Sequence, residues 1–167
     1  MRNFLRFAAA GAALATVVSF GGVANAATTQ SASASVQILS TLNVAKTRDL
    51  SFGQVAANGA GALVLAADGT TTCAAALVCT GTRQTAEFTV AGSAGTAVTA
   101  TLASTSITLS DGASHTMTVD QLGVHFPNGN TLTGGATAFN VGGRLNVGAA
   151  QVAGTYTGTF NVSVEYQ

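Results

Sequence analysis

Apolar and polar residues alternate with a period of two along most of the chain after residue 26, which is the spacing of a β-strand with one buried face. The alternation predicts strands at residues 42–44, 50–55, 62–66, 85–91, 98–103, 107–109, 116–122, 138–147 and 154–166. Turn-forming pairs such as Asp68-Gly69, Asp111-Gly112 and Asn128-Gly129 stand between them. With no helical stripe in this region, we predict an all-β fold, an immunoglobulin-like antiparallel β-sandwich, ahead of a closed barrel.

The C-terminal alternation is the longest in the sequence. Every second residue from Gly154 faces one side, and polar residues, mostly Thr, Ser and Asn, occupy the positions between. At the usual rise of a strand this segment is about 40 Å long, with one face committed to a core. The residues of that face are Gly154, Tyr156, Gly158, Phe160, Val162, Val164 and Tyr166.

The first 26 residues have the pattern of a cleavable signal peptide. Arg2 and Arg6 precede an apolar run over residues 7–18, and Ala24-Asn25-Ala26 has the small residues of a signal-peptidase site. The run is too short for a transmembrane helix, which needs about 20 apolar residues. We therefore expect residues 27–167 to form one exported domain without a transmembrane segment, located in the periplasm, at the cell surface or outside the cell.

Charged residues are only 7% of the chain, against about 25% in typical soluble proteins. Residues 27–167 contain four basic and six acidic side chains, a net charge of −2, with no basic cluster. This composition argues against nucleic-acid binding, which depends on lysine and arginine. A surface of neutral polar residues carries little repulsion between copies and suits a subunit that assembles.

Cys73 and Cys79 are the only cysteines, and an even count in an exported chain predicts a disulfide. So short a loop corresponds to about 2 kcal/mol of stabilisation in the chain-entropy model. The spacing does not match the Cys-x-x-Cys motif of redox enzymes. The lesser alternative to a disulfide is a thiol pair that is reduced or binds a metal.

Few residues offer catalytic or metal-binding chemistry. Ser114, His115 and Asp120 can be written as a triad, but no Gly-x-Ser-x-Gly turn presents a nucleophile. His115, Asp111 and Asp120 lack the spacing of a dedicated metal site. Only two glutamates, Glu87 and Glu165, are available for paired-carboxylate hydrolysis. We therefore expect neither an enzyme nor a protein that needs a cofactor or a metal.

Five motifs follow one another along the chain in a characteristic order: Leu42-Asn43-Val44, Asp49-Leu50-Ser51-Phe52-Gly53, Ala86-Glu87-Phe88-Thr89-Val90, Val141-Gly142-Gly143-Arg144-Leu145-Asn146-Val147 and residues 153–164. Over residues 36–167 this set resembles the DUF4402 family of exported bacterial proteins. Tyr166 is the penultimate residue and Gly154 is fourteenth from the end, and in this the C-terminal strand resembles those of chaperone-usher pilins and spore-coat-U-type subunits.

The pilin resemblance implies assembly by β-strand addition, in which a periplasmic chaperone and then the arm of the next subunit pair with the C-terminal strand. The expected donor arm is residues 27–38, with Ala32, Ala34, Val36 and Ile38 on one face. The expected partners are copies of the chain or related subunits, with a chaperone and an outer-membrane usher, and the expected location is then a fimbrium. The alternative is a monomeric adhesin or glycan-binding module, although the chain has no Trp to stack on a sugar ring.

Overall fold

A computed structural model describes residues 28–167, so the expected signal peptide lies outside the described residues. The chain divides into two units, residues 1–36 and 37–167. In the first unit, residues 28–36 form neither helix nor strand. The second unit contains eleven β-strands, one short 3₁₀ turn at Thr133–Gly135 and, within the described range, no α-helix.

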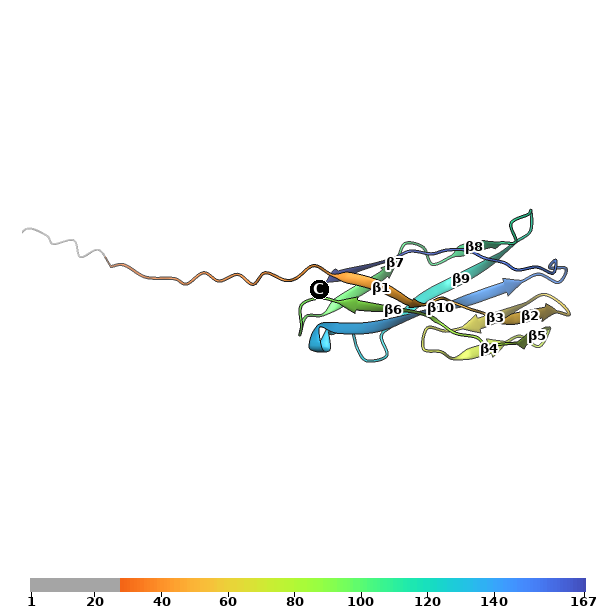
Figure 1. Cartoon of the computed structure of the whole chain (residues 1–167), viewed down its shortest axis with the longest axis horizontal. Coiled ribbons are helices and arrows are strands. Elements are labelled where there is room, and N and C mark those ends of the chain that lie inside the picture. The colour runs from red at the N-terminus through yellow and green to blue at the C-terminus, as the bar shows by residue number, and fades with distance from the viewer. Residues whose placement is uncertain (1–27) are drawn as a thin grey trace, which may run out of the picture. The chain divides into compact units, whose positions relative to one another are not determined.

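The strands follow one another as labelled in Figure 1. In chain order they are β1 (Asn43–Arg48), β2 (Gln54–Ala57), β3 (Gly61–Leu65), β4 (Thr71–Cys73), β5 (Leu77–Thr80), β6 (Ala86–Ala91), β7 (Val98–Leu102), β8 (Ile107–Ser110), β9 (Thr116–His125), β10 (Ala136–Val147) and β11 (Val162–Tyr166).

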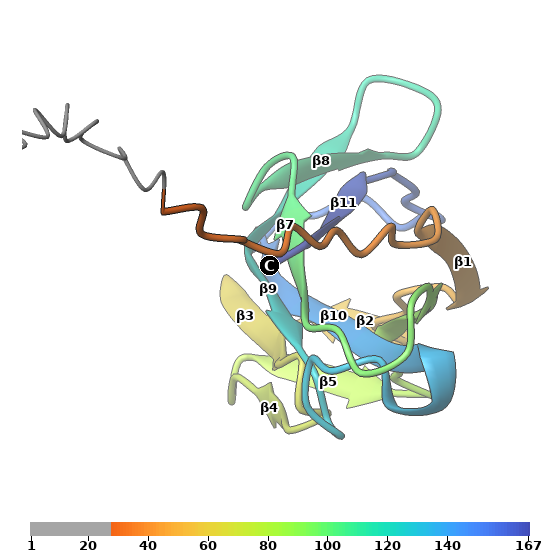
Figure 2. The same cartoon turned by 90° about the vertical axis from the view of Figure 1, so that its left-hand side faces the viewer.

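The longest strand, β10, organises a seven-stranded antiparallel sheet. One edge of β10 pairs first with β6 and then with β3, while its other edge pairs with β9. The sheet continues from β6 to β1, from β3 to β4 and from β9 to β8. Two small antiparallel sheets, β7–β11 and β2–β5, complete the fold (Figure 2). These curled antiparallel sheets confirm the predicted all-β fold class.

Alternate residues of the strands form the core, as the period of two predicts. Phe139 in β10 is fully buried, and its ring stacks on Phe88 in β6 with 5.2 Å between ring centroids. Phe126 also packs on Phe139, with 5.3 Å between ring centroids. The remaining buried hydrophobic residues include Leu63, Leu65, Val90, Val98, Val119, Leu132 and Val141.

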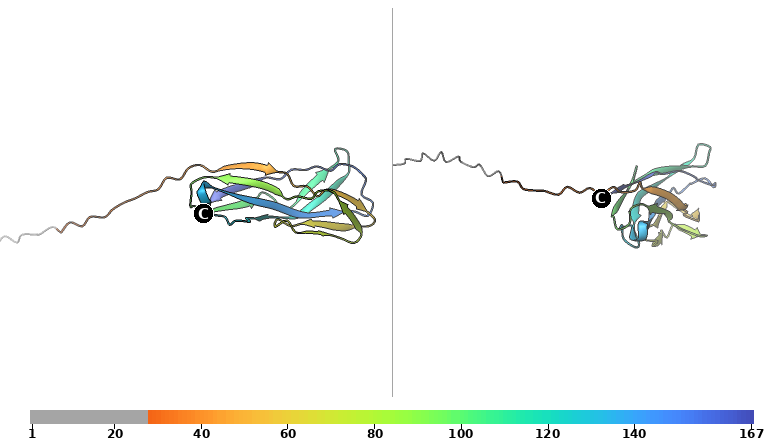
Figure 3. Two further views of the ribbon diagram at one scale, coloured as in Figure 1. Left: turned by 60° about the horizontal axis from the view of Figure 1, so that its bottom comes forward. Right: turned by 60° about the vertical axis from the view of Figure 1, so that its left-hand side comes forward.

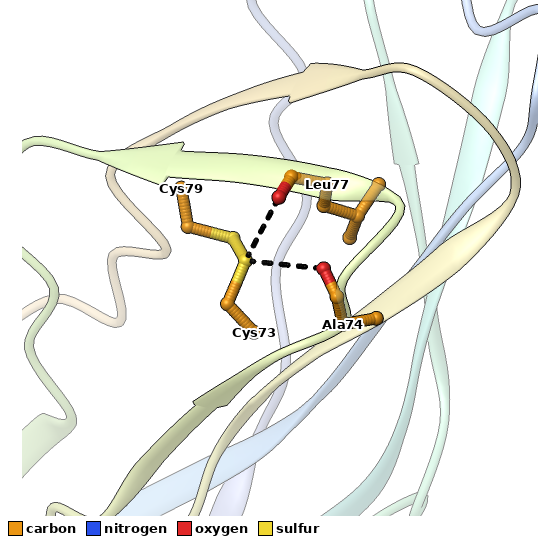
Figure 4. Close-up of a disulfide and its surroundings, with 4 residues drawn as sticks. All are labelled: Cys73, Ala74, Leu77 and Cys79. Carbon is orange, nitrogen blue, oxygen red and sulfur yellow. Dashed lines mark hydrogen bonds between the residues drawn. A yellow bond between two sulfur atoms is a disulfide. The ribbon is translucent and has the colours of Figure 1, made fainter.

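Two predicted features lie where the sequence placed them. The turn after β3 contains Asp68 and Gly69, with Gly69 at φ +91° and the Asp68 carboxylate accepting hydrogen bonds from the N–H and the hydroxyl of Thr70. Cys73 and Cys79 form the predicted disulfide, with their Cα atoms 6.3 Å apart (Figure 4). This bond links β4 to β5, and therefore ties the large sheet to the small β2–β5 sheet.

The C-terminal strand is shorter than predicted. Only Val162, Val164 and Tyr166 of its apolar face belong to β11, which pairs with β7. Between Gly154 and Asn161 the ladder is reduced to one bridge, at Thr157. A β-ladder needs a partner strand, whereas an alternation of apolar and polar residues in the sequence does not. The alternating sequence therefore begins well before the residues that pair with β7.

Two further differences concern the segment around the cysteines and the predicted donor arm. The short strands β4 and β5 lie around the cysteines, where no strand was predicted. Residues 31–38 alternate in sequence but form no strand. A β-strand gains its hydrogen bonds only from a neighbouring strand.

Candidate functional site

An apolar groove of about 990 Å³ lies in the domain formed by residues 37–167. Its two rims are residues 49–57, which follow β1 and include β2, and residues 151–160, which precede β11. We call this cavity the groove, and these two segments the first and second rim.

Four strands supply the floor of the groove. The floor residues are apolar because each is an inward-facing member of an alternating strand. They are Ala86 and Phe88 of β6, Ile107 and Leu109 of β8, Met117 and Val119 of β9, and Leu145 and Val147 of β10. Leu50, Phe52 and Val55 from the first rim and Phe160 from the second are half-buried and pack against the same core.

Both rims have unused capacity for backbone pairing. On the first rim, Ser51 exchanges backbone hydrogen bonds with Gln84, and β2 pairs with β5 alone among the described strands. On the second rim, the backbone-to-backbone bonds of residues 152–160 within the described chain are the two that Thr157 makes with Ser110. Among the described strands, β1 pairs with β6 alone and β11 with β7 alone (Figure 2). The groove is thus bordered by two segments that have few backbone partners.

The predicted donor arm is exposed. Val36 and Ile38 have 87% and 90% of their surface accessible, although large apolar side chains are usually buried. Ala32 and Ala34 are exposed as well. All four side chains of the predicted donor face are therefore exposed.

The segment that follows the arm is attached to the rest of the domain through Tyr166, the last residue of β11. The Tyr166 hydroxyl donates to the carbonyl oxygen of Ser40 at 2.8 Å and accepts from the N–H of Ser93 at 2.8 Å. The N–H of Ser40 donates to the Ser93 hydroxyl at 2.7 Å. The Ser93 N–H is the main cause of a lowered pKa of Tyr166. Figure 3 shows the start of β1 and the C-terminus at the same end of the domain.

Glycine at position 92 is required by this attachment. A Cβ atom there would lie 2.4 Å from the Tyr166 hydroxyl oxygen and 2.8 Å from a methyl carbon of Leu42. Leu42 is half-buried against the core, so the chain is held on both sides of Thr41. We call the contacts of Ser40, Ser93 and Tyr166 the clamp.

The predicted assembly residues fall into two groups. Phe160, Val162, Val164 and Tyr166 all pack against the core, and Phe160 also contacts Phe88 edge to face at 6.2 Å between ring centroids. Gly154 and Tyr156 lie on the second rim, and the Tyr156 hydroxyl donates to the carbonyl of Val152. Sequence reasoning missed the floor, because no local pattern reveals which strands meet around a cavity. It also missed Ser40 and Ser93, which are ordinary polar residues in the sequence.

His115 and Asp120, which were considered for catalysis, each interact with a different partner. His115 contacts the carboxylate of Asp111 through Nδ1 at 2.6 Å. Asp120 receives two hydrogen bonds of 2.8 Å from the Arg144 guanidinium, which lower the pKa of that carboxyl. Lys46 and Arg48 of β1 form ion pairs with Asp49 and Glu87, respectively.

Metal-binding clusters and membrane-spanning helices were the remaining kinds of feature to consider. Over residues 28–167, no group of three or more histidine, cysteine, aspartate or glutamate side chains is arranged to hold a metal ion. In that same range, no helix has both the length and the apolar character to cross a membrane.

Comparison with known proteins gives one result. A family model described as "Domain of unknown function (DUF4402)" matches residues 42–166, which include the floor, both rims and Tyr166 but not the arm. No curated protein and no solved structure matches the chain.

Proposed function

Since the chain belongs to the DUF4402 family, whose description leaves function open, we propose from the groove and the arm that it is an exported structural subunit that assembles by β-strand addition. In this proposal an extended segment enters the groove, pairs with the free backbone of a rim and places alternate side chains on the floor. The arm, residues 27–38, is the donor segment.

The observation that carries the proposal is the groove itself. Its floor is apolar, its rims have few backbone partners, and the same chain carries an unpaired alternating segment with exposed Val36 and Ile38. Exposed strand edges normally promote pairing with other chains, and proteins usually protect them with charge, proline or a covering segment. A groove that keeps both edges free suits controlled assembly.

The energetics favour pairing through a few side chains. Complete burial of Val36 or Ile38 is worth about 1.5–3 kcal/mol each. Backbone hydrogen bonds along the rim add smaller net contributions, and the ordering of the arm opposes binding. Ala32 and Ala34 bury little area, so we expect the end of the arm nearest the domain to dominate the affinity.

A non-enzymatic role in the cell envelope fits the same features. Before assembly, an exposed apolar groove favours aggregation, which a periplasmic chaperone that supplies a temporary strand would prevent. The proposed locations are therefore the periplasm during export and the cell surface, as a fimbrium or a similar polymer, after assembly.

The test is the charge-introducing variant Ile38→Asp. An unpaired carboxylate in the apolar groove costs several kcal/mol, so this variant should lose polymer, as seen by electron microscopy and by ladders on unboiled gels. Gln37→Asp is the matched control, because it adds the same charge on the opposite face of the arm and should still assemble.

Two outcomes contradict the proposal. If unmodified protein from the native envelope runs only as a monomer, the subunit function fails and a monomeric binding module becomes the better explanation. If Gln37→Asp loses polymer as completely as Ile38→Asp, assembly depends on the net charge of the arm and not on its apolar face.

A further inference from the structure

We infer that Lys46 protects the free edge of β1 against pairing with strands of other molecules, and that Asp49 holds the charge of Lys46 in place for this role. The inference does not involve the arm, since it concerns β1 and its neighbours within residues 37–167. It therefore goes beyond the proposed function and can hold or fail independently of it.

Strand β1 is an open edge of the large sheet (Figure 2). It pairs with β6 on one side, and outside that ladder no backbone-to-backbone hydrogen bond within the described chain involves residues 43–48. A free row of N–H and C=O groups is a template to which a strand of another molecule can add. Val44 and Thr47 are residue types that favour strands, so the sequence of β1 does not itself oppose such pairing.

Lys46 lies on the inward face of β1. In the β1–β6 ladder Lys46 is opposite Phe88, and Val44 is opposite Val90. Opposite residues of an antiparallel pair project to the same face of the sheet, and both Phe88 and Val90 are buried. The inward face of a strand that covers a core is normally apolar, so a lysine at this position departs from the pattern that β6 follows.

The charge of Lys46 is held beside the groove. Its ammonium group contacts the Asp49 carboxylate at 2.5 Å, and both side chains line the groove together with Phe88. Both also remain in water, with 55% and 76% of their side-chain surface accessible. An ion pair so exposed contributes little to stability, so stability does not explain a lysine on this face.

A strand that added to β1 would bring its own side chains beside Lys46 and Asp49 and would remove the ion pair from water. The desolvation of two paired charges commonly outweighs their mutual attraction, so such pairing is disfavoured. Inward-pointing charges and β-bulges are two means by which proteins keep edge strands from pairing. β1 has both, because its register with β6 shifts between Lys46 and Arg48.

The experiment uses the exported chain with Ile38→Asp, which the proposed function expects to block assembly through the groove. In this parent, Lys46→Val replaces the charge with an apolar side chain. The dissociation constant of the dimer, measured by sedimentation velocity, should fall at least about tenfold, because burial of a valine side chain is favourable by that factor. Hydrogen exchange should show newly protected amides in β1.

Two variants are matched controls. Lys46→Arg keeps the charge, and Thr47→Val adds an apolar side chain at the neighbouring position, where Thr47 contacts Thr89 on the outward face of β1. Neither should associate more strongly than the parent. Lys46→Gln removes the charge but stays polar, so it should show a smaller increase in association than Lys46→Val, and urea denaturation of each variant establishes that it is folded.

The outcomes decide the role of Lys46 separately from the proposed function. If Lys46→Val and Lys46→Gln associate no more strongly than Thr47→Val, Lys46 has no protective role. The same conclusion follows if association of Lys46→Val protects the amides of β2 and leaves those of β1 unprotected. If the Ile38→Asp parent still polymerises, the proposed function fails, and the protection of β1 amides in Lys46→Val relative to Thr47→Val still decides whether Lys46 guards the edge.

Discussion

At the scale of single residues, Gly142 shows how a motif is explained by close backbone approach. A Cβ atom at this position would lie 2.3 Å from the carbonyl oxygen of Leu65 and 2.5 Å from the backbone nitrogen of Ala67. Its neighbour Gly143 leaves space for the side chains of Leu122 and Val119. The two glycines of the Val141–Val147 motif therefore allow β10 to pair on both edges.

Gly142→Ala should destabilise the domain by about 3 kcal/mol, because backbone atoms of residues 65–67 cannot move aside as a flexible side chain can. Urea denaturation measures the free energy of unfolding. Gly123→Ala is the matched control: Gly123 faces Gly142 in the ladder, and its added Cβ would have no neighbour closer than 4.0 Å. Equal losses in both variants would contradict the explanation.

Asp120 gives the domain an acid-sensitive contribution to stability. Its pKa is lowered in the folded state by hydrogen bonds from Arg144, so its contribution is present above the unfolded pKa of about 3.9 and is lost as the pH falls through the folded value. The unfolding free energy of the unmodified protein should fall below about pH 4. Asp120→Asn should show a shallower fall in urea denaturation at a series of pH values, and identical slopes would contradict the assignment.

At the scale of elements, the disulfide supports the groove as well as the fold. Cys79 belongs to β5, the strand that pairs with β2 of the first rim, and Cys73 belongs to β4 of the large sheet. The bond therefore anchors the small sheet that carries part of the first rim.

Replacing both Cys73 and Cys79 with Ser should reduce the free energy of unfolding by about 2 kcal/mol. It should also increase the hydrogen exchange of β2 amides more than that of β7 amides, since β7 pairs with β11 in a different sheet. Uniform exchange across both small sheets would show that the disulfide does not support the first rim in particular.

At the scale of the whole molecule, assembly in this proposal depends on a short apolar segment of an otherwise polar arm. Val36 and Ile38 are its largest side chains, whereas residues 27–35 are Ala, Thr, Ser and Gln. Polymer stability should therefore be concentrated near the junction between arm and domain.

Deleting residues 27–35 should weaken assembly less than Ile38→Asp does, because the deletion retains both large side chains. The dissociation of purified polymer in increasing denaturant, followed on unboiled gels, compares the two variants. If the deletion abolishes polymer while Ile38→Asp preserves it, the outer half of the arm carries the affinity instead.

Features that depend on neighbours along the chain could be predicted from the amino-acid sequence. The period of two in β3, β6, β7 and β8 indicates which side chains face the core, and the Asp-Gly pairs indicate turns. Two cysteines six residues apart can form a bond at a small entropic cost of loop closure. These elements and the disulfide were predicted correctly for that reason.

Which strands surround the groove could be learned only from the folded chain. The floor of the groove combines residues 86–88, 107–109, 117–119 and 145–147, and the clamp joins Ser40 to Tyr166. Such contacts depend on strand order and register, which alternation within one strand does not specify. The C-terminal segment shows the same limit: alternation correctly indicated that Phe160, Val162, Val164 and Tyr166 pack on one side against the core, but whether residues 154–161 had a partner strand depended on where β7 ends, at Leu102.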